Sequence, residues 1–206
     1  MKPNQFLALL ITLIIISCKE NTPTINQVTL PKFDPELGIT QSESDSIYEA
    51  FYLNIKKNTI NKSLPKTIVY DKDWNAITLN DYLQKSTILA YSGVHCGFGY
   101  EFICEQFPRV KDSLEFMTNK TINAIQLITY TQEDSLEQES IHRRLSESKG
   151  IYQYTFFIPQ STAFKHNAYG NTFRYYLKNE IITNISFGLN LYSDTILANE
   201  ITSYHL

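Results

Sequence analysis

A succession of short apolar runs, separated by helix-like segments, constrains the fold of this chain more than any other feature. Turn-forming residues bound these runs, and the run over residues 87–91 is typical of a buried central strand. The strand-like runs are 67–70, 76–79, 87–91, 122–129, 154–158, 173–177 and 181–187. Because these strands alternate with helices, the pattern predicts an α/β sandwich around one mixed sheet.

Helical periodicity falls between these runs. The spacing of apolar residues predicts a helix over 42–57 and an amphipathic helix after Gly97. The apolar stripe of the second helix consists of Ile103, Phe107, Val110, Leu114 and Met117. Pro108 lies inside this stripe and is expected to kink the helix. Further helices are expected over 133–148, over 162–168 and from residue 189 to the end.

The composition is that of an ordinary globular protein. The 206 residues are 43% hydrophobic and 19% charged, which excludes a disordered or low-complexity chain. The formal net charge of −3 reflects no basic surplus, so nucleic acid is not expected as a partner. His142, His166 and His205 are scattered without the spacing of a zinc or iron site. No metal and no other cofactor is therefore expected.

The first seventeen residues have the features of a signal peptide. Lys2 supplies a positive charge, and the apolar run 6–16 is too short to span a membrane. The run leads into Ile-Ile-Ser-Cys18, which resembles the lipobox of bacterial lipoproteins. The resemblance implies that Cys18 receives a diacylglyceryl group, that cleavage precedes it, and that its amino group is acylated, for example with palmitate. A plain secretory signal with an incidental cysteine is the alternative.

Residues 19–41 are polar, contain three prolines and show no steady period, so they are expected to form a tether. The chain is thus divided into a lipoprotein signal peptide (1–17), a lipidated tether with a short helix (18–63) and an α/β domain (64–206). An acylated Cys18 would hold the protein on a membrane surface of the cell envelope. Disulfides can persist in that extracytoplasmic compartment.

Three stretches resemble the thioredoxin-like superfamily, specifically the membrane-anchored thiol-disulfide oxidoreductases and redoxins of bacterial envelopes. Residues 71–81 are similar to the family's hairpin, and residues 87–96 have its spacing from central strand to cysteine. Residues 170–173, followed by 178–181 and Gly188, are similar to its Gly-x-Pro-Thr-Phe segment and closing hairpin. The resemblance covers about residues 64 to 206. It implies a thioredoxin-like three-layer sandwich with a thiol active site.

The sequence departs from the family at both halves of the implied active site. The family's Cys-x-x-Cys motif reads Cys96-Gly97-Phe98-Gly99 here, so glycine replaces the second cysteine. The family's cis-proline falls at about Asn171, and a cis bond before a non-proline residue costs about 2.5–4 kcal/mol. The implied active-site loop comprises His95, Gly97, Phe98, Gly99, Asn171 and Thr172.

In this fold Cys96 would lie between the central strand and the N-terminus of a helix. Unpaired backbone N–H groups and the helix dipole would lower the pKa of its thiol and make it a nucleophile near neutral pH. A protonated His95 would lower that pKa further. The alternative is a small, partly buried Cys96 in an inherited loop that does no chemistry.

Cys104 lies eight residues after Cys96. A continuous helix would separate their Cα atoms by about 12 Å, whereas a disulfide needs about 7 Å or less. A bond between them therefore requires the helix to begin after the two glycines of the motif. A resolving thiol, a structural disulfide and a buried free thiol all remain open for Cys104.

Two functions follow. The first is a membrane-tethered thioredoxin-like lipoprotein that acts on protein thiols or disulfides through Cys96, with Cys104 or an outside thiol completing the cycle. The second is a non-catalytic binding or scaffold lipoprotein that keeps the thioredoxin fold without the redox pair.

Overall fold

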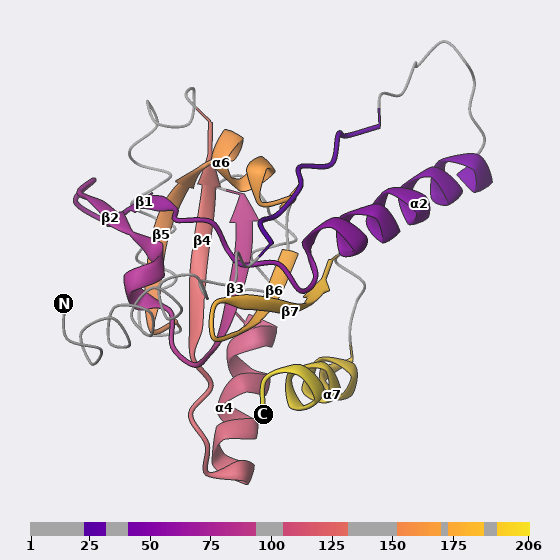
Figure 1. The fold of residues 1–206 in the computed structure, drawn as a ribbon. Helices are drawn as coiled ribbons and strands as arrows, with labels where there is room; N and C mark the ends of the chain where they lie inside the picture. Colours follow the sequence, from indigo (N-terminus) through magenta and orange to yellow (C-terminus); the bar gives the residue numbers. More distant parts are fainter. Residues whose placement is uncertain (1–22, 32–40, 94–104, 132–151, 170–172, 188–192) are drawn as a thin grey trace, which may run out of the picture.

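The computed structural model of the protein describes residues 23–31, 41–93, 105–131, 152–169, 173–187 and 193–206. A mixed seven-stranded sheet, in the order β2-β1-β5-β4-β3-β6-β7, lies at its centre (Figure 1). The strands are β1 (Ile68–Tyr70), β2 (Ala76–Thr78), β3 (Ser86–Gly93), β4 (Ala124–Tyr130), β5 (Tyr154–Pro159), β6 (Phe173–Lys178) and β7 (Ile181–Ser186). Every predicted strand is present, and the predicted mixed sheet is confirmed.

The central position of β3 explains its apolar sequence. It pairs in parallel with β4, from Ile88 opposite Ala124 to Gly93 opposite Thr129. On its other side it pairs antiparallel with β6, from Ser86 opposite Lys178 to Tyr91 opposite Phe173. Six consecutive residues of the strand are buried, because helices cover both faces of the sheet at this point.

Helices form the two outer layers, as Figure 1 shows. Helices α2 (Gln41–Thr59) and α6 (Gln160–Lys165) contribute Phe51, Ile55 and Ala163 to the core on one face. Helices α4 (Phe107–Thr118) and α7 (Asp194–Tyr204) contribute Phe107 and Leu197, among others, to the core on the opposite face. The short 3-10 helix η2 (Leu79–Tyr82) connects β2 to β3. The three-layer sandwich expected from the sequence is thus confirmed.

The β6–β7 connection is a two-residue hairpin. Lys178 pairs with Ile181, and both intervening residues have positive φ, 50° at Asn179 and 64° at Glu180. Two successive positive φ values are those of a type I′ turn, whose twist matches that of the flanking strands. The predicted hairpin is therefore present.

Helix α4 differs from its prediction at both ends. Residues 105–106 have π-helical geometry and α4 begins at Phe107, so Pro108 lies in the first turn, where no helical N–H is required. At the other end Met117 is 66% exposed, so the buried stripe ends at Leu114. The predicted helix over 133–148 lies outside the described residues.

The N-terminal part of the described chain contacts the same core as the sheet. Val28 is buried, and α2 packs its Phe51 and Ile55 against the face of the sheet that α2 and α6 cover. Residues 23–31, expected to belong to a polar tether, therefore lie against the domain that was predicted to start at residue 64. The rest of that expected tether before α2, the signal peptide and Cys18 lie outside the described residues.

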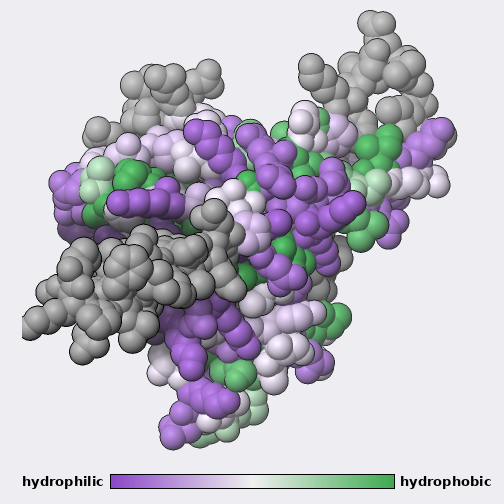
Figure 2. All heavy atoms as spheres, viewed as in Figure 1, coloured by the Kyte–Doolittle hydropathy of each residue, from purple (hydrophilic) through white to green (hydrophobic). Residues whose placement is uncertain are grey.

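Figure 2 shows hydrophilic and apolar side chains intermixed along α2, the helix at the upper right of this view. The exposed apolar residues of this helix include Leu53 at 64%. None of the helices in the described ranges is both long enough and apolar enough to cross a bilayer.

Candidate functional site

The residues predicted to form the active site all lie outside the described residues. They fall in two gaps of the description, 94–104 and 170–172. The first gap holds His95, Cys96, Cys104 and the glycines of the motif, and the second holds Asn171 and Thr172. The structure therefore describes the strands that flank these two segments, β3 before the first and β6 after the second.

The two gaps adjoin neighbouring strands at the same end of the sheet. The first follows Gly93 at the end of β3, and the second precedes Phe173 at the start of β6. Because β3 and β6 are antiparallel, the end of one strand lies beside the start of the other. Tyr91, five residues before Cys96, is directly opposite Phe173, which follows Thr172.

His166, at the C-terminal end of α6, is the centre of a buried hydrogen-bond network on the face of the sheet that α2 and α6 cover. Its Nε2 lies 2.9 Å from Thr67 Oγ1, and its Nδ1 lies 3.0 Å from the hydroxyl of Tyr91. Thr67 donates its only hydroxyl proton to the carbonyl oxygen of Pro65, at 2.8 Å. The Thr67 oxygen must therefore accept from Nε2–H, which leaves Nδ1 to accept from the hydroxyl of Tyr91.

Burial determines the protonation states in this network. Burial, with a smaller contribution from the charge of Lys165, lowers the pKa of His166 to about 4. Burial also raises the pKa of the Tyr91 hydroxyl, and raises that of Tyr175, which donates to the His166 carbonyl. The network is neutral near pH 7. It joins the strand that precedes Cys96 to the segment that precedes Asn171.

Residues 167 and 169 continue this junction toward the N-terminus. Asn167 Oδ1 accepts from the backbone N–H of Val28 at 2.7 Å, and its Nδ2 donates to the carbonyl of Asn26 and to Thr59 Oγ1. The hydroxyl of Tyr169 donates to the carbonyl of Val28. The side chains just before residues 170–172 thus hold the N-terminal segment and the end of α2 in place.

A second set of polar side chains lies near Ser92, close to the end of β3. The amide of Gln126 donates to Ser92 Oγ at 3.5 Å and accepts from Thr155 Oγ1 at 3.3 Å. Thr129 Oγ1 donates to the carbonyl of Ser92 at 3.0 Å. These groups are uncharged, so they position the end of the strand without supplying an acid or a base.

Arg174 and Glu200 form a buried ion pair on the face of the sheet that α4 and α7 cover. Arg174 on β6 is fully buried, and its Nε donates to Glu200 Oε1 of α7 at 2.9 Å. Ser186 and Tyr176 also donate to this carboxylate. Burial alone would raise the pKa of Glu200, but hydrogen bonds and the charge of Arg174 outweigh it and hold the pKa below its ordinary value. The ion pair attaches α7 to β6 at Arg174, which is two residues after Thr172.

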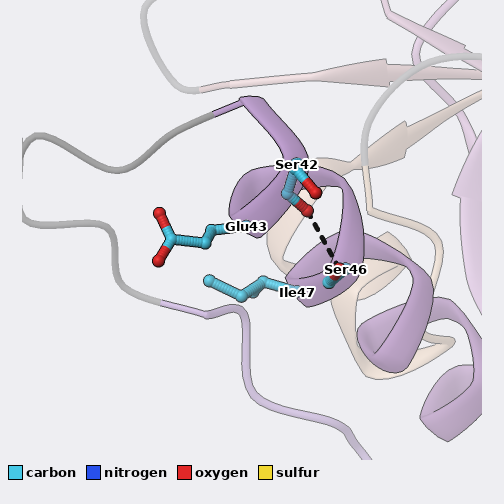
Figure 3. Close-up of a pocket in the computed structure, with 4 residues that line it drawn as sticks. All are labelled: Ser42, Glu43, Ser46 and Ile47. Atoms are coloured by element: carbon cyan, nitrogen blue, oxygen red, sulfur yellow. Dashed lines mark hydrogen bonds between the residues drawn. The ribbon is translucent and has the colours of Figure 1, made fainter.

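Helix α2 borders a cavity of about 370 Å³ at its N-terminal end (Figure 3). Its lining residues are Ser42, Glu43, Ser46 and Ile47. Glu43 and Ile47 point away from the helix on the same side, and Ser46 Oγ donates to the Ser42 carbonyl at 2.9 Å. Among the described lining residues, one exposed carboxylate lies beside a hydroxyl that bonds within the helix, and these groups form no catalytic arrangement. This cavity is not part of the predicted site.

Within the described ranges, no three His, Cys, Asp or Glu side chains gather closely enough to hold a metal ion. Sequence reasoning dismissed His166 as scattered, and it did not single out Arg174 or Glu200. No local pattern identifies these contacts, because the His166 partners Thr67 and Tyr91 lie 99 and 75 residues away.

No protein-family model matches the sequence, and no curated protein is significantly similar to it. Solved structures are similar to it in fold. A thiol:disulfide interchange protein from Bacteroides sp. superposes with a TM-score of 0.50 at 14% identity, covering 69% of this chain and 88% of its own. Yeast Sco1 gives 0.52 at 11% identity, covering 69% and 93%.

A thioredoxin-like protein from Bacteroides caccae gives a TM-score of 0.54 at 10% identity. That match covers 82% of this chain and 58% of the Bacteroides caccae chain. At these identities the similarity establishes the fold and leaves the chemistry to be argued from the site. Together with the strand order and the two helical layers, it identifies the chain as a protein of the thioredoxin-like fold.

Proposed function

We propose that this chain is a membrane-tethered lipoprotein of the bacterial cell envelope that carries out thiol-disulfide chemistry at Cys96. One observation carries the proposal: the segment with Cys96 follows a buried central strand, next to the start of β6, in a thioredoxin-like fold. The similarity to a thiol:disulfide interchange protein supports the same chemistry.

The proposed reaction uses the thiolate of Cys96. It attacks one sulfur of a substrate disulfide, forms a mixed disulfide with that sulfur and releases the other as a thiolate. Because Gly99 stands where a second cysteine would resolve the intermediate, a second thiolate must come from Cys104 or from an outside thiol. An outside thiolate attacks the substrate sulfur, takes over the mixed disulfide and releases Cys96 as a thiolate. Cys104 instead attacks the sulfur of Cys96, which forms a Cys96–Cys104 disulfide and releases the second substrate sulfur as a thiolate. The proposed substrates are protein thiols and disulfides of the envelope.

The rate of Cys96 alkylation as a function of pH tests the proposal. The full-length protein is reacted with iodoacetamide, and the modified cysteines are identified by mass spectrometry. We expect an apparent pKa clearly below about 8.5, the value of a free cysteine thiol. Cys96→Ser should abolish the low-pKa reaction, and Cys104→Ser serves as the matched control that retains it. An unreactive Cys96, or one with an ordinary pKa, would favour the non-catalytic scaffold instead.

The membrane anchor is proposed at Cys18 and has its own test. Cys18→Ala should move the protein from the membrane fraction to the soluble fraction of the envelope. Lipidation is read directly from the mass of the mature protein. An unchanged distribution between the fractions would exclude the anchor without affecting the chemistry proposed for Cys96.

A further inference from the structure

The first described residues extend the sheet beyond its last strand. The carbonyl of Pro23 accepts from the N–H of Ser63 at 3.0 Å, and Thr24 forms a parallel bridge with Ser63. Ser63 in turn bridges Ile181 at the start of β7. Residues 23–24 therefore lie at the outer edge of the sheet on the β7 side and attach the N-terminal segment to the fold.

The attachment is strong along the following residues. Val28 is 5% exposed. Its backbone N–H donates a hydrogen bond to the side chain of Asn167, and its carbonyl accepts one from the hydroxyl of Tyr169. Asn167 is fully buried and makes three hydrogen bonds to the N-terminal segment and α2. Releasing the segment would leave these buried groups unpaired, at about 1–3 kcal/mol for each.

The distance from the lipid anchor to this attachment point is short. Pro23 follows Cys18 by five residues, and five residues span at most about 18 Å even when fully extended. This limit holds for any conformation of residues 19–22. The expected tether over residues 19–41 would let the domain move freely above the membrane, whereas five residues hold it against the surface.

We propose that the anchored protein rests with the β7 edge of its sheet against an anionic lipid surface, an orientation that depends on the proposed acylation of Cys18. The charge of this edge supports the proposal. Residues 56–62 include Lys56, Lys57 and Lys62 and no Asp or Glu, and the carbonyl of Lys62 accepts from the N–H of Ile182 on β7. At the adjacent hairpin the charges of Lys178 and Glu180 offset each other. Each lysine near an anionic bilayer contributes about 1 kcal/mol to binding.

The register of the sheet separates the thiol site from the attachment point along the direction of the strands. Thr24, Ser63, Ile181, Lys178 and Ser86 follow one another across paired chains, so the attachment is level with the start of β3. The segment carrying Cys96 leaves the other end of β3, which is about 23 Å away for seven steps along a strand.

Lysine footprinting on membranes tests this orientation. The lipidated full-length protein is reconstituted in vesicles of phosphatidylethanolamine and phosphatidylglycerol and treated with an amine-acylating reagent. The comparison is a variant with a long Gly/Ser linker inserted between residues 22 and 23, on the same vesicles. Lys72 is the internal reference, because its side chain is 73% exposed on the β1–β2 turn, five to six strand spacings or about 24–29 Å from β7.

We expect Lys57 and Lys62 to react several-fold more slowly in the wild type than in the linker variant, with Lys72 equally reactive in both. Equal reactivity of all three lysines in both proteins, while both float with the vesicles, would overturn the orientation and leave the anchor intact. Failure of the wild type to float would remove the anchor and the orientation together. Neither result bears on the alkylation of Cys96.

Discussion

Trp74 adopts a backbone conformation that is unusual for a bulky side chain. Its φ of 63° lies in the left-handed region, where glycine is the favoured residue. Asp71 holds this turn, accepting from the backbone N–H groups of Asp73 and Asn75 at 2.9 and 2.8 Å. The indole stacks on Phe157 at 5.2 Å and meets Tyr130 edge-on at 5.4 Å. The ring contacts offset the backbone strain.

Two substitutions separate these effects. Trp74→Ala removes the ring and keeps the strain, whereas Trp74→Gly removes both. We expect both variants to be less stable than the wild type, with Trp74→Gly more stable than Trp74→Ala by about 1 kcal/mol. Urea denaturation of the two proteins measures the difference. Equal stabilities would mean that the turn relaxes once the ring is removed.

His166 makes the stability of the protein depend on pH. Its pKa of about 4 in the folded protein lies below the ordinary value of 6.5, so the unfolded chain binds a proton first as the pH falls. The folded state is therefore favoured fully above pH 6.5 and loses stability between about 6.5 and 4. His205, which is bonded to Ser86, also has its pKa lowered to about 4, mainly by burial, and acts in the same direction.

We expect unfolding free energies measured in urea to fall over this window, with His166 contributing up to about 3 kcal/mol. His166→Gln should flatten the pH profile, and His205→Gln, which removes a second buried histidine with a lowered pKa, should flatten it as well. A profile unchanged by His166→Gln would show that this histidine is not kept neutral by the fold.

At the scale of elements, the buried pair of Arg174 and Glu200 connects the final helix to the sheet. Each side chain has its charge matched by the other, and neighbouring hydroxyl groups complete the hydrogen bonding of the carboxylate. A buried pair of this kind adds little net stability, but removing one partner strands the other charge in the core. The two single substitutions and the double substitution should therefore not be additive.

Arg174→Met and Glu200→Gln are each expected to cost about 3–5 kcal/mol, and the double variant to cost less than the sum. A double-mutant cycle by thermal or urea denaturation measures this coupling. Ser186→Ala, which removes a neutral donor to the same carboxylate, is the matched control and should cost about 1 kcal/mol. Additive costs would indicate that α7 is held mainly by Leu197 and Ile201.

The helices and strands were largely predictable, because short apolar runs indicate buried strands and the turn residues between two of them indicate the hairpin. The limits of α4 were less so: the apolar stripe continues through Met117, but the helix extends past the sheet and that residue is exposed. The packing of residues 23–31 was not predictable, since Val28 is a single apolar residue whose partners, Asn167 and Tyr169, lie far along the chain. The same separation hid the His166 network.

At the scale of the whole molecule, the sheet has two functionally different ends. The N-terminal segment joins the fold level with the start of β3, and the segment with Cys96 leaves its other end. The thioredoxin-like arrangement was predictable from the order of elements and the spacing from strand to cysteine. The chemistry was not, because one glycine in place of a cysteine leaves a single thiol whose reactivity depends on its surroundings.

Reaction of the full-length protein with glutathione disulfide tests the central claim directly. The thiolate of Cys96 should displace one glutathione thiolate and retain the other as a mixed disulfide, which added glutathione reverses. Mass spectrometry of the folded protein should find this adduct at Cys96 in the wild type and in Cys104→Ser, or a disulfide from Cys96 to Cys104 in the wild type. An adduct that forms only after unfolding, or at Cys104 alone, would contradict the account.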